Sequence, residues 1–239
     1  MTEYLFHGDS YLREFSAMVI SVNEETRSVI LDRTAFYPGG GGQLCDTGML
    51  SDGKVFWPVE NVRKSDGSIL HSLGGTDPLP VPGIPVTGAL DWERRYRLMR
   101  THTAMHILCG VIFRDYGAHV TGGDMDLQQG RMDFEFESMS RELVNVIEEA
   151  VNREVEKDLP VRVKILPREE AFQIPDLIRT KINLLPVGIP EVRTVEIVGL
   201  DLQADGGTHV ASTREVGRMR IVDYKSKGRI NKRIYIEIE

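Results

Sequence analysis

The sequence predicts an α+β protein, in which a small N-terminal β-barrel is followed by an α+β domain with helices packed on an antiparallel sheet. Three observations support this. Short apolar runs separated by turn residues fill the first 90 residues, a long apolar stretch of helical period follows Asp91, and helical and alternating segments follow that stretch. We therefore place the domains at residues 1–90 and 91–239.

The first domain is predicted to be built from short strands. Turn residues such as Ser65–Gly67 separate the apolar runs, a spacing typical of a small barrel. The segment Asp77–Pro85 contains four prolines and cannot be helical, so it is predicted to be a loop that leads to the last strand of the barrel. The predicted strands are Met18–Val22, Ser28–Leu31, Val55–Trp57 and Ile69–His71.

The second domain mixes helices and strands. Asp91 is a predicted N-cap of a long helix, and an amphipathic helix is predicted after Ser140, where apolar residues recur at helical spacing. Alternating segments predict half-buried strands. These strands are Val161–Ile165, Val192–Val198, Met219–Val222 and Arg233–Ile238.

Composition favours a compact cytoplasmic protein. The 239 residues are 41% hydrophobic and 27% charged, enough apolar material for one large core or two modest ones. Two cysteines are too few for a disulfide framework, which favours a reducing compartment. The N-terminus lacks a basic segment followed by an apolar one, and no apolar stretch approaches the roughly 20 residues that span a bilayer. We expect neither export nor a membrane partner.

Four residues predict a site for a divalent metal ion. His102 and His106 are spaced i, i+4 and lie on one face of the predicted long helix, where both imidazoles can reach one ion. About a hundred residues later, Asp205 and His209 flank a Gly-Gly-Thr segment that lets a second pair approach. A metalloprotease would need a glutamate directly after the first histidine, and Thr103 stands there instead. The protease interpretation is therefore rejected.

Three segments resemble a known family, in the same order and with similar spacing. They are Phe36–Gln43 (FYPGGGGQ), Asp91–His106 (DWERRYRLMRTHTAMH) and Gly206–Val210 (GGTHV). They resemble the editing domain of alanyl-tRNA synthetase and its free-standing AlaX relatives, and the resemblance covers nearly the whole chain. It implies an aminoacyl-tRNA deacylase that hydrolyses alanine tRNA wrongly charged with serine or glycine. We expect no long helical C-terminal extension, so the chain resembles the shorter free-standing forms.

One position of the expected metal site departs from the family pattern. The family has cysteine before Gly-Gly-Thr-His, and this sequence has Asp205. An aspartate also binds zinc, so a site of three histidines and one aspartate remains chemically sensible for Zn²⁺. A carboxylate is a harder donor than a thiolate, so such a site binds manganese, iron or cobalt more readily than a site with cysteine does. Asp205 either ligates the ion directly or orients a histidine from outside the coordination shell.

The resemblance also implies residues that contact the substrate. Gly40, Gly41 and Gly42 form a loop whose bare backbone admits an aminoacyl ester, and Arg100 binds substrate. The loop lacks the Lys-Ser/Thr of a phosphate loop, so it is not expected to bind a nucleoside triphosphate. As catalytic residues we expect Gln43 to fix substrate or water and Thr34 to offer its hydroxyl to the serine side chain.

Local charge suggests the partner, although the whole chain carries a net charge of −7. Basic residues cluster at the start of the long helix and near the C-terminus, and such runs can follow phosphates even in an acidic protein. Pairing with nearby acids is the alternative. With the resemblance, we expect the acceptor end of tRNA(Ala) as partner, and no DNA. The basic residues are Arg94, Arg95, Arg97, Arg100, Arg218, Arg220, Lys225, Lys227, Arg229, Lys232 and Arg233.

The sequence leaves mechanism and some alternatives open. A bound metal either lowers the pKa of water or, with four protein ligands closing its shell, only positions the substrate. Two other functions are compatible with the same scaffold: a non-catalytic tRNA-binding module, and a metal-dependent hydrolase of small esters or amides. Editing has a physical rationale. The apolar pocket of a synthetase that binds alanine separates it from serine or glycine by only about 1–3 kcal/mol, so a second site must remove the wrong amino acid.

Overall fold

The computed structural model describes residues 2–180, 185 and 188–239 of the chain. The chain forms two compact units, Met1–Tyr96 and Arg97–Glu239. Among the described residues, no helix is both long and apolar enough to cross a membrane.

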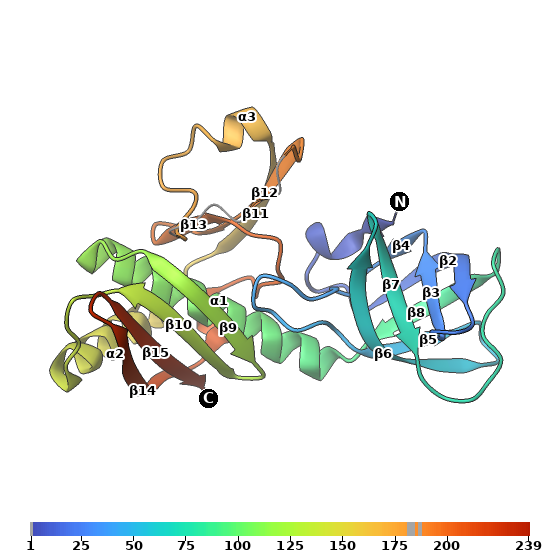
Figure 1. The fold of residues 1–239 in the computed structure, drawn as a ribbon, viewed down its shortest axis with the longest axis horizontal. Coiled ribbons are helices and arrows are strands. Elements are labelled where there is room, and N and C mark those ends of the chain that lie inside the picture. The colour runs from blue at the N-terminus through green and yellow to red at the C-terminus, as the bar shows by residue number, and fades with distance from the viewer. Residues whose placement is uncertain (1, 181–184, 186–187) are drawn as a thin grey trace. The chain divides into compact units, whose positions relative to one another are not determined.

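The first unit is a closed six-stranded antiparallel barrel (Figure 1). Around the barrel the strand order is β2-β3-β7-β6-β5-β8. A short 3-10 helix (Leu5–His7) and a parallel pair of two-residue strands, β1 (Glu3–Tyr4) and β4 (Arg33–Thr34), accompany it. The barrel strands are β2 (Glu14–Asn23), β3 (Ser28–Leu31), β5 (Gly48–Ser51), β6 (Phe56–Ser65), β7 (Ser68–Leu73) and β8 (Pro85–Leu90).

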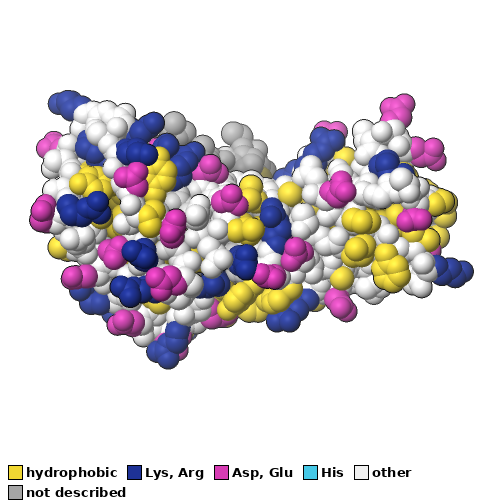
Figure 2. All heavy atoms as spheres, turned by 90° about the horizontal axis from the view of Figure 1, so that it is seen from below, with side chains coloured by type: hydrophobic (Ala, Val, Ile, Leu, Met, Phe, Trp, Pro, Cys, Tyr) yellow, Lys and Arg dark blue, Asp and Glu magenta, His cyan; other side chains and the backbone are white. Residues whose placement is uncertain are grey.

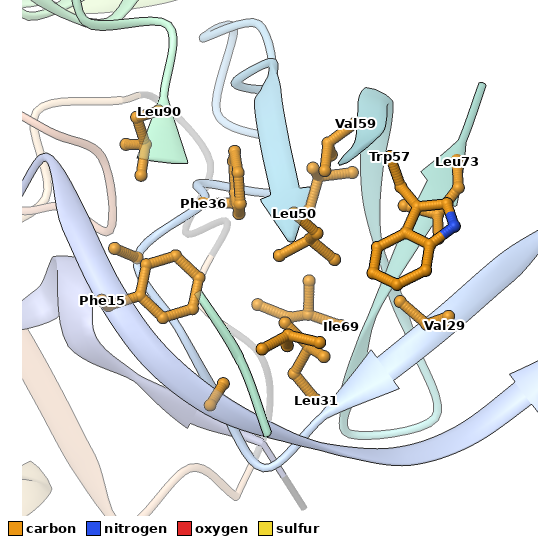
Figure 3. Packing of buried hydrophobic residues seen from close by; sticks show 14 of the residues in the cluster. Phe15, Val29, Leu31, Phe36, Leu50, Trp57, Val59, Ile69, Leu73 and Leu90 are labelled. Atoms are coloured by element: carbon orange, nitrogen blue, oxygen red, sulfur yellow. The ribbon is translucent and has the colours of Figure 1, made fainter. Parts of the chain in front are cut away.

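The barrel interior is filled by one apolar cluster drawn from all six strands (Figure 3). Alternation produces it: in β2, Phe15, Ala17 and Val19 are buried while the residues between them are exposed. Gly88 on the neighbouring strand makes room for Phe15, because a Cβ at position 88 would lie 2.4 Å from the Phe15 ring. The cluster excludes water from the barrel and fixes the register of β2 against β8.

His71 is a buried polar residue within this barrel. Its Nε2 lies 2.9 Å from the Thr34 hydroxyl and its Nδ1 lies 3.3 Å from the carbonyl of Val29. Burial lowers the pKa of His71 to about 4, against a partial opposing effect of the Val29 carbonyl. The imidazole is therefore neutral at physiological pH and links β7 to the end of β4.

The second unit combines a four-stranded antiparallel sheet, in the order β14-β15-β10-β9, with helices α1 and α2. Asp91 caps α1, since its carboxylate accepts from the backbone N–H of Arg94 at 3.1 Å, and Ser140 caps α2 through the N–H of Leu143. The elements are α1 (Trp92–Tyr116), β9 (Val120–Asp126), β10 (Gln129–Glu135), α2 (Arg141–Glu156), β14 (Met219–Gly228) and β15 (Asn231–Ile238).

Helix α2 covers the exposed edge of this sheet. Asn152 donates to the carbonyl of Met219 at 2.8 Å and accepts from its N–H at 3.0 Å, and Glu148 accepts from the N–H of Ile221. These side chains satisfy backbone groups of β14 that would otherwise be open to another strand.

A three-stranded antiparallel sheet, in the order β11-β12-β13, completes the unit. Its strands are β11 (Val161–Pro167), β12 (Glu191–Ile197) and β13 (Asp201–Ala204), and a one-turn helix α3 (Arg168–Ala171) follows β11. A second 3-10 helix (Thr213–Val216) is closed by a capping box between Ser212 and Glu215. β13 matters most for function, because the chain leaves it directly into the Gly-Gly-Thr-His segment.

The α+β class, the barrel and both predicted helix caps are confirmed, whereas β1, β4, β5, β9, β10 and β13 were not predicted. β9 contains the pair Gly122 and Gly123, which weakens any strand pattern. Met105 of α1 packs closely on Gly123 of β9 and Gly130 of β10: a Cβ at position 123 or 130 would lie 3.3 Å or 3.1 Å from its side chain, which would have to shift.

We expect the first unit to lose stability as the pH falls from 6.5 towards 4. His71 has a folded-state pKa below its unfolded value of 6.5, so protonation favours the unfolded chain, and about 3 kcal/mol is lost by pH 4. The fluorescence of Trp57 and Trp92, the two tryptophans of the chain, both in this unit, reports its urea unfolding. His71→Leu should flatten the pH dependence, and an equally steep dependence in this variant would contradict the assignment.

Candidate metal centre

Helix α1 presents two histidines on one buried face. His102 and His106 are 5% and 7% exposed, and their ring centroids are 5.1 Å apart. The i, i+4 spacing places the two rings next to each other along the helix, in an edge-to-face arrangement. Both imidazoles point into protein rather than into solvent, which is the setting of a ligand or of a hydrogen-bonded core residue.

The segment after β13 brings the second pair to the same place. The His209 ring lies 4.2 Å from that of His102 and 4.7 Å from that of His106, measured between centroids. Asp205 is held by the turn that follows it, because one carboxylate oxygen, Oδ2, accepts from the N–H of Gly207 at 2.7 Å. The Gly-Gly pair thus folds the chain back on Asp205 and delivers His209 four residues later.

The four residues fit a divalent ion. Each offers one ligand atom, and these atoms all lie within 4.8 Å of one another. Asp205 Oδ1 is 3.5 Å from His102 Nε2, and Asp205 Oδ2 is 3.1 Å from His209 Nε2. In a tetrahedral zinc site with bonds of about 2.1 Å, two ligand atoms are roughly 3.4 Å apart, and the two distances lie on either side of this value. Three imidazole nitrogens and one carboxylate oxygen are donors that zinc accepts.

The electrostatics of the cluster keep three of its four donors in the form that binds metal. Burial lowers the pKa of His102 to about 4 and holds that of His209 well below 6.5, so both are neutral. Burial alone would raise the pKa of Asp205, but at the low pH where Asp205 titrates the protonated His102 and the hydrogen bond from His209 outweigh it and hold that pKa well below 3.8. Metal ligands must be deprotonated, so these three are ready to bind an ion.

His106 differs because a second carboxylate touches it. Burial would lower its pKa, but the hydrogen bond and charge of Asp201 raise it above 6.5. Asp201 Oδ2 lies 3.0 Å from His106 Nδ1, and the Asp201 side chain is fully buried. A proton on this imidazole must leave before its Nε2 can bind an ion.

Sequence reasoning missed Asp201, although a signal was present. Asp201 and Gln203 alternate on β13 and so share one face, Asp205 follows directly after the strand, and all three contact the histidine cluster. Leu202 and Ala204 lie on the other face, packed against a small apolar cluster. A short strand with polar residues at every second position beside a Gly-Gly-Thr-His segment predicts a buried polar face.

The glycine loop belongs to the first unit and is closed on itself. Gly40 and Gln43 exchange both backbone hydrogen bonds at 3.0 Å, and the Tyr37 hydroxyl donates to the Gly40 carbonyl. Gly39 to Gly42 all have positive φ, which favours glycine at each position. A Cβ at Gly41 would meet nothing within 4 Å, so this side of the loop is open.

A buried ion pair anchors the base of this loop. Arg95 and Asp46 are both buried, and the Arg95 Nε donates to the Asp46 carboxylate at 3.0 Å. Asp46 also accepts from the N–H of Tyr37, and its own N–H donates to the Tyr37 carbonyl. The two ends of the loop are thus fastened at a single point.

The structure places both predicted catalytic residues in the first unit and buries both. Thr34 is fully buried, and its hydroxyl contacts His71 and accepts from the N–H of Phe36 at 3.1 Å. Gln43 is 3% exposed and ends the glycine loop. The hydroxyl of Thr34 therefore has two internal partners, and its role in choosing the substrate stays a prediction.

Arg100 lies on α1 just before His102, but its side chain binds backbone carbonyls. Its guanidinium donates to the carbonyls of Glu215, Val216 and Glu239. It thereby ties the second 3-10 helix and residue 239 to α1, which is a structural function that needs no substrate. The substrate-binding role of Arg100 also stays a prediction.

Comparisons with known proteins identify the family. A family model described as "Threonyl and Alanyl tRNA synthetase second additional domain" matches residues 192–235, and one described as "tRNA synthetases class II (A)" matches residues 10–94. The alanyl-tRNA editing proteins AlaX-M of Saccharolobus solfataricus and Methanosarcina acetivorans are 42% and 39% identical to the whole chain, over 100% and 99% of their own lengths. The chain belongs to the alanyl-tRNA editing protein family. The alanine–tRNA ligase of Ignicoccus hospitalis is 40% identical over 92% of this chain, which corresponds to 24% of the ligase.

We expect the purified protein to hold about one divalent ion, because three imidazoles and a carboxylate converge within bonding reach. His106→Ala should remove most of the ion, as should Asp205→Ala if this carboxylate is a ligand. Asp205→Cys should retain the ion and shift the preference towards zinc, since a thiolate is the softer donor. Elemental analysis after dialysis against competing metals measures each of these outcomes.

Glu149→Gln is the matched control, since this carboxylate is exposed on α2 and pairs with Arg153. Metal content in His106→Ala equal to that of the parent would refute the metal centre. Retention by Asp205→Ala alone would place Asp205 outside the coordination shell.

Proposed function

We propose that the protein is a trans-editing hydrolase that deacylates tRNA(Ala) mischarged with serine or glycine. The observation that carries this proposal is the buried cluster of His102, His106, Asp205 and His209 in a chain that matches alanyl-tRNA editing proteins over its full length. The relatives named alanyl-tRNA editing proteins support editing of alanyl-tRNA. The choice of serine and glycine and the use of a metal are our own extension.

The proposed metal is zinc, held by His102, His106, Asp205 and His209. When bound, it supplies a positive charge that stabilises an oxyanion or orients the polar groups of an ester. Asp205 Oδ2 is already occupied by the N–H of Gly207, which favours ligation through Oδ1. Arg193 lies 3.7 Å from Asp205 Oδ2 and donates to its backbone carbonyl, which fixes the carboxylate further.

The glycine loop is proposed to receive the aminoacyl ester. The loop presents bare backbone at Gly41, and the Asp46–Arg95 pair holds its ends in place, so a substrate meets a prepared surface. Gln43 is proposed to position substrate or water, because its amide both donates and accepts. Gly40 and Gly42 are proposed to let the ester approach the backbone closely.

The partner is proposed to be the acceptor end of tRNA(Ala). Near the C-terminus, Lys225 pairs with Asp223 and Arg233 with Asp133. On the face drawn in Figure 2, basic and acidic side chains are interspersed, in agreement with such pairing. For phosphate contacts we propose four exposed cations of the C-terminal segment: Arg218, Arg220, Lys227 and Arg229.

Release of amino acid from charged tRNA tests the proposal. The protein should release serine and glycine from tRNA(Ala) and leave alanine in place, and a chelator should abolish release while added zinc restores it. Serine on its own cognate tRNA is the control for the tRNA body. Absence of release with intact metal content would indicate a non-catalytic tRNA-binding module. Equal release from seryl-adenosine would indicate a hydrolase of small esters.

The role of Thr34 in selecting serine is tested with Thr34→Val, which keeps the shape and removes the hydroxyl. If this hydroxyl binds the serine side chain, serine release falls about twofold to a hundredfold while glycine release changes less, because one hydrogen bond is lost. Single-turnover rates on the two charged tRNAs measure this. His71→Leu removes the internal partner of the same hydroxyl and serves as the control. A proportional fall in both rates would leave Thr34 with only its structural role.

A further inference from the structure

The three histidines of the cluster are supported by different groups. Each has a partner besides Asp205: the Thr208 backbone for His102, the Thr103 hydroxyl at 3.1 Å from Nδ1 for His209, and the Asp201 carboxylate at 3.0 Å from Nδ1 for His106. Only the third partner is an anion. A carboxylate behind a metal-binding imidazole fixes its tautomer and makes it a better donor.

Asp201 is surrounded by groups that can donate. Its Oδ2 lies 3.0 Å from His106 Nδ1 and accepts from Gln203 Nε2 at 2.7 Å, and its Oδ1 accepts from Arg179 Nε at 3.4 Å. Both oxygens must therefore be acceptors, which an ionised carboxylate satisfies and a carboxamide does not. This arrangement requires the Nδ1 of His106 to carry the proton, which leaves its Nε2 free to face the cluster.

A glycine on α1 allows Asp201 to reach His106. Gly110 lies one helical turn after His106, on the same face. A Cβ at position 110 would lie 2.9 Å from Leu200 Cγ and 3.0 Å from Asp201 Cβ, closer than such atoms pack. The start of β13 thus rests directly on the backbone of α1, and any side chain at position 110 would push it away.

We propose that Asp201 is a positioning residue for the metal centre, which holds His106 with Nδ1 protonated and Nε2 directed at the ion, and that Gly110 provides the space for it. The proposal rests on the metal site of the proposed function and assigns that site a second carboxylate. Asp201 does not contact the ion itself.

Asp201→Asn removes the negative charge and replaces one carboxylate oxygen by an NH₂ group. This NH₂ group must then face either His106 and Gln203 or Arg179, all of which donate to Asp201 in the parent. If the NH₂ faces His106, the imidazole must accept at Nδ1 and carries its proton on Nε2, where it cannot bind metal. We expect a zinc affinity about 10- to 100-fold lower, as is typical when such a partner is lost. Gly110→Ala should lower the affinity in the same direction, although alanine favours a helix over glycine.

Zinc affinity is measured by competition with a chelating dye, in parent, Asp201→Asn, Gly110→Ala and Glu149→Gln proteins whose circular dichroism is first shown to match. Thr103→Val, which removes the uncharged partner of His209, should weaken binding less than Asp201→Asn does. Equal affinity in Asp201→Asn and parent would overturn the proposal. A parent without affinity for zinc would instead refute the metal site on which the proposal rests.

A second readout needs neither a variant nor a metal. Nitrogen-15 spectra of the metal-free parent at pH 9 should show His106 as the Nδ1–H tautomer, because Asp201 accepts that proton. Observation of the Nε2–H tautomer would overturn the proposal even if Asp201→Asn failed to fold.

Discussion

The packing of the polar face of β13 against α1 is the interaction on which the rest of the second unit depends. Burying Asp201 and Asp205 costs free energy unless each is paired and hydrogen-bonded. Imidazoles from α1, the guanidinia of Arg179 and Arg193, and backbone N–H groups fulfil that requirement. The functional cluster is therefore also a folding constraint, since β13 can approach α1 closely only where its charges find these partners.

Asp205 gives the candidate metal centre a carboxylate where the pattern that the chain resembles has a cysteine. A carboxylate has two oxygens, so one can accept from Gly207 while the other faces His102. A single sulfur atom offers no such division of roles. The carboxylate is also the harder donor, which widens the range of ions that the site accepts.

In the first unit, side-chain contacts hold a loop of four glycines in one conformation. Glycine permits the positive φ angles of Gly39 to Gly42 but does not select them. Selection comes from the buried Arg95–Asp46 pair at the base of the loop and from the Tyr37 hydroxyl bound to Gly40. Arg95 lies on the first turns of α1, so the same helix that carries the histidines also begins at the anchor of this loop.

The sequence by itself determined the features that depend on short-range geometry. The i, i+4 spacing placed His102 and His106 on one face, and Asp91 and Ser140 marked the starts of their helices, because side chain and backbone are neighbours there. The partners of buried polar groups were decided only by the tertiary structure. Thr34 and Arg100 have types that suit substrate contact, yet His71 and three backbone carbonyls bind them. Asp201 reaches His106 across 95 residues through a gap left by Gly110. A hydrogen bond joins whichever groups the packed chain brings within about 3 Å, and that proximity is set by the packing of distant segments.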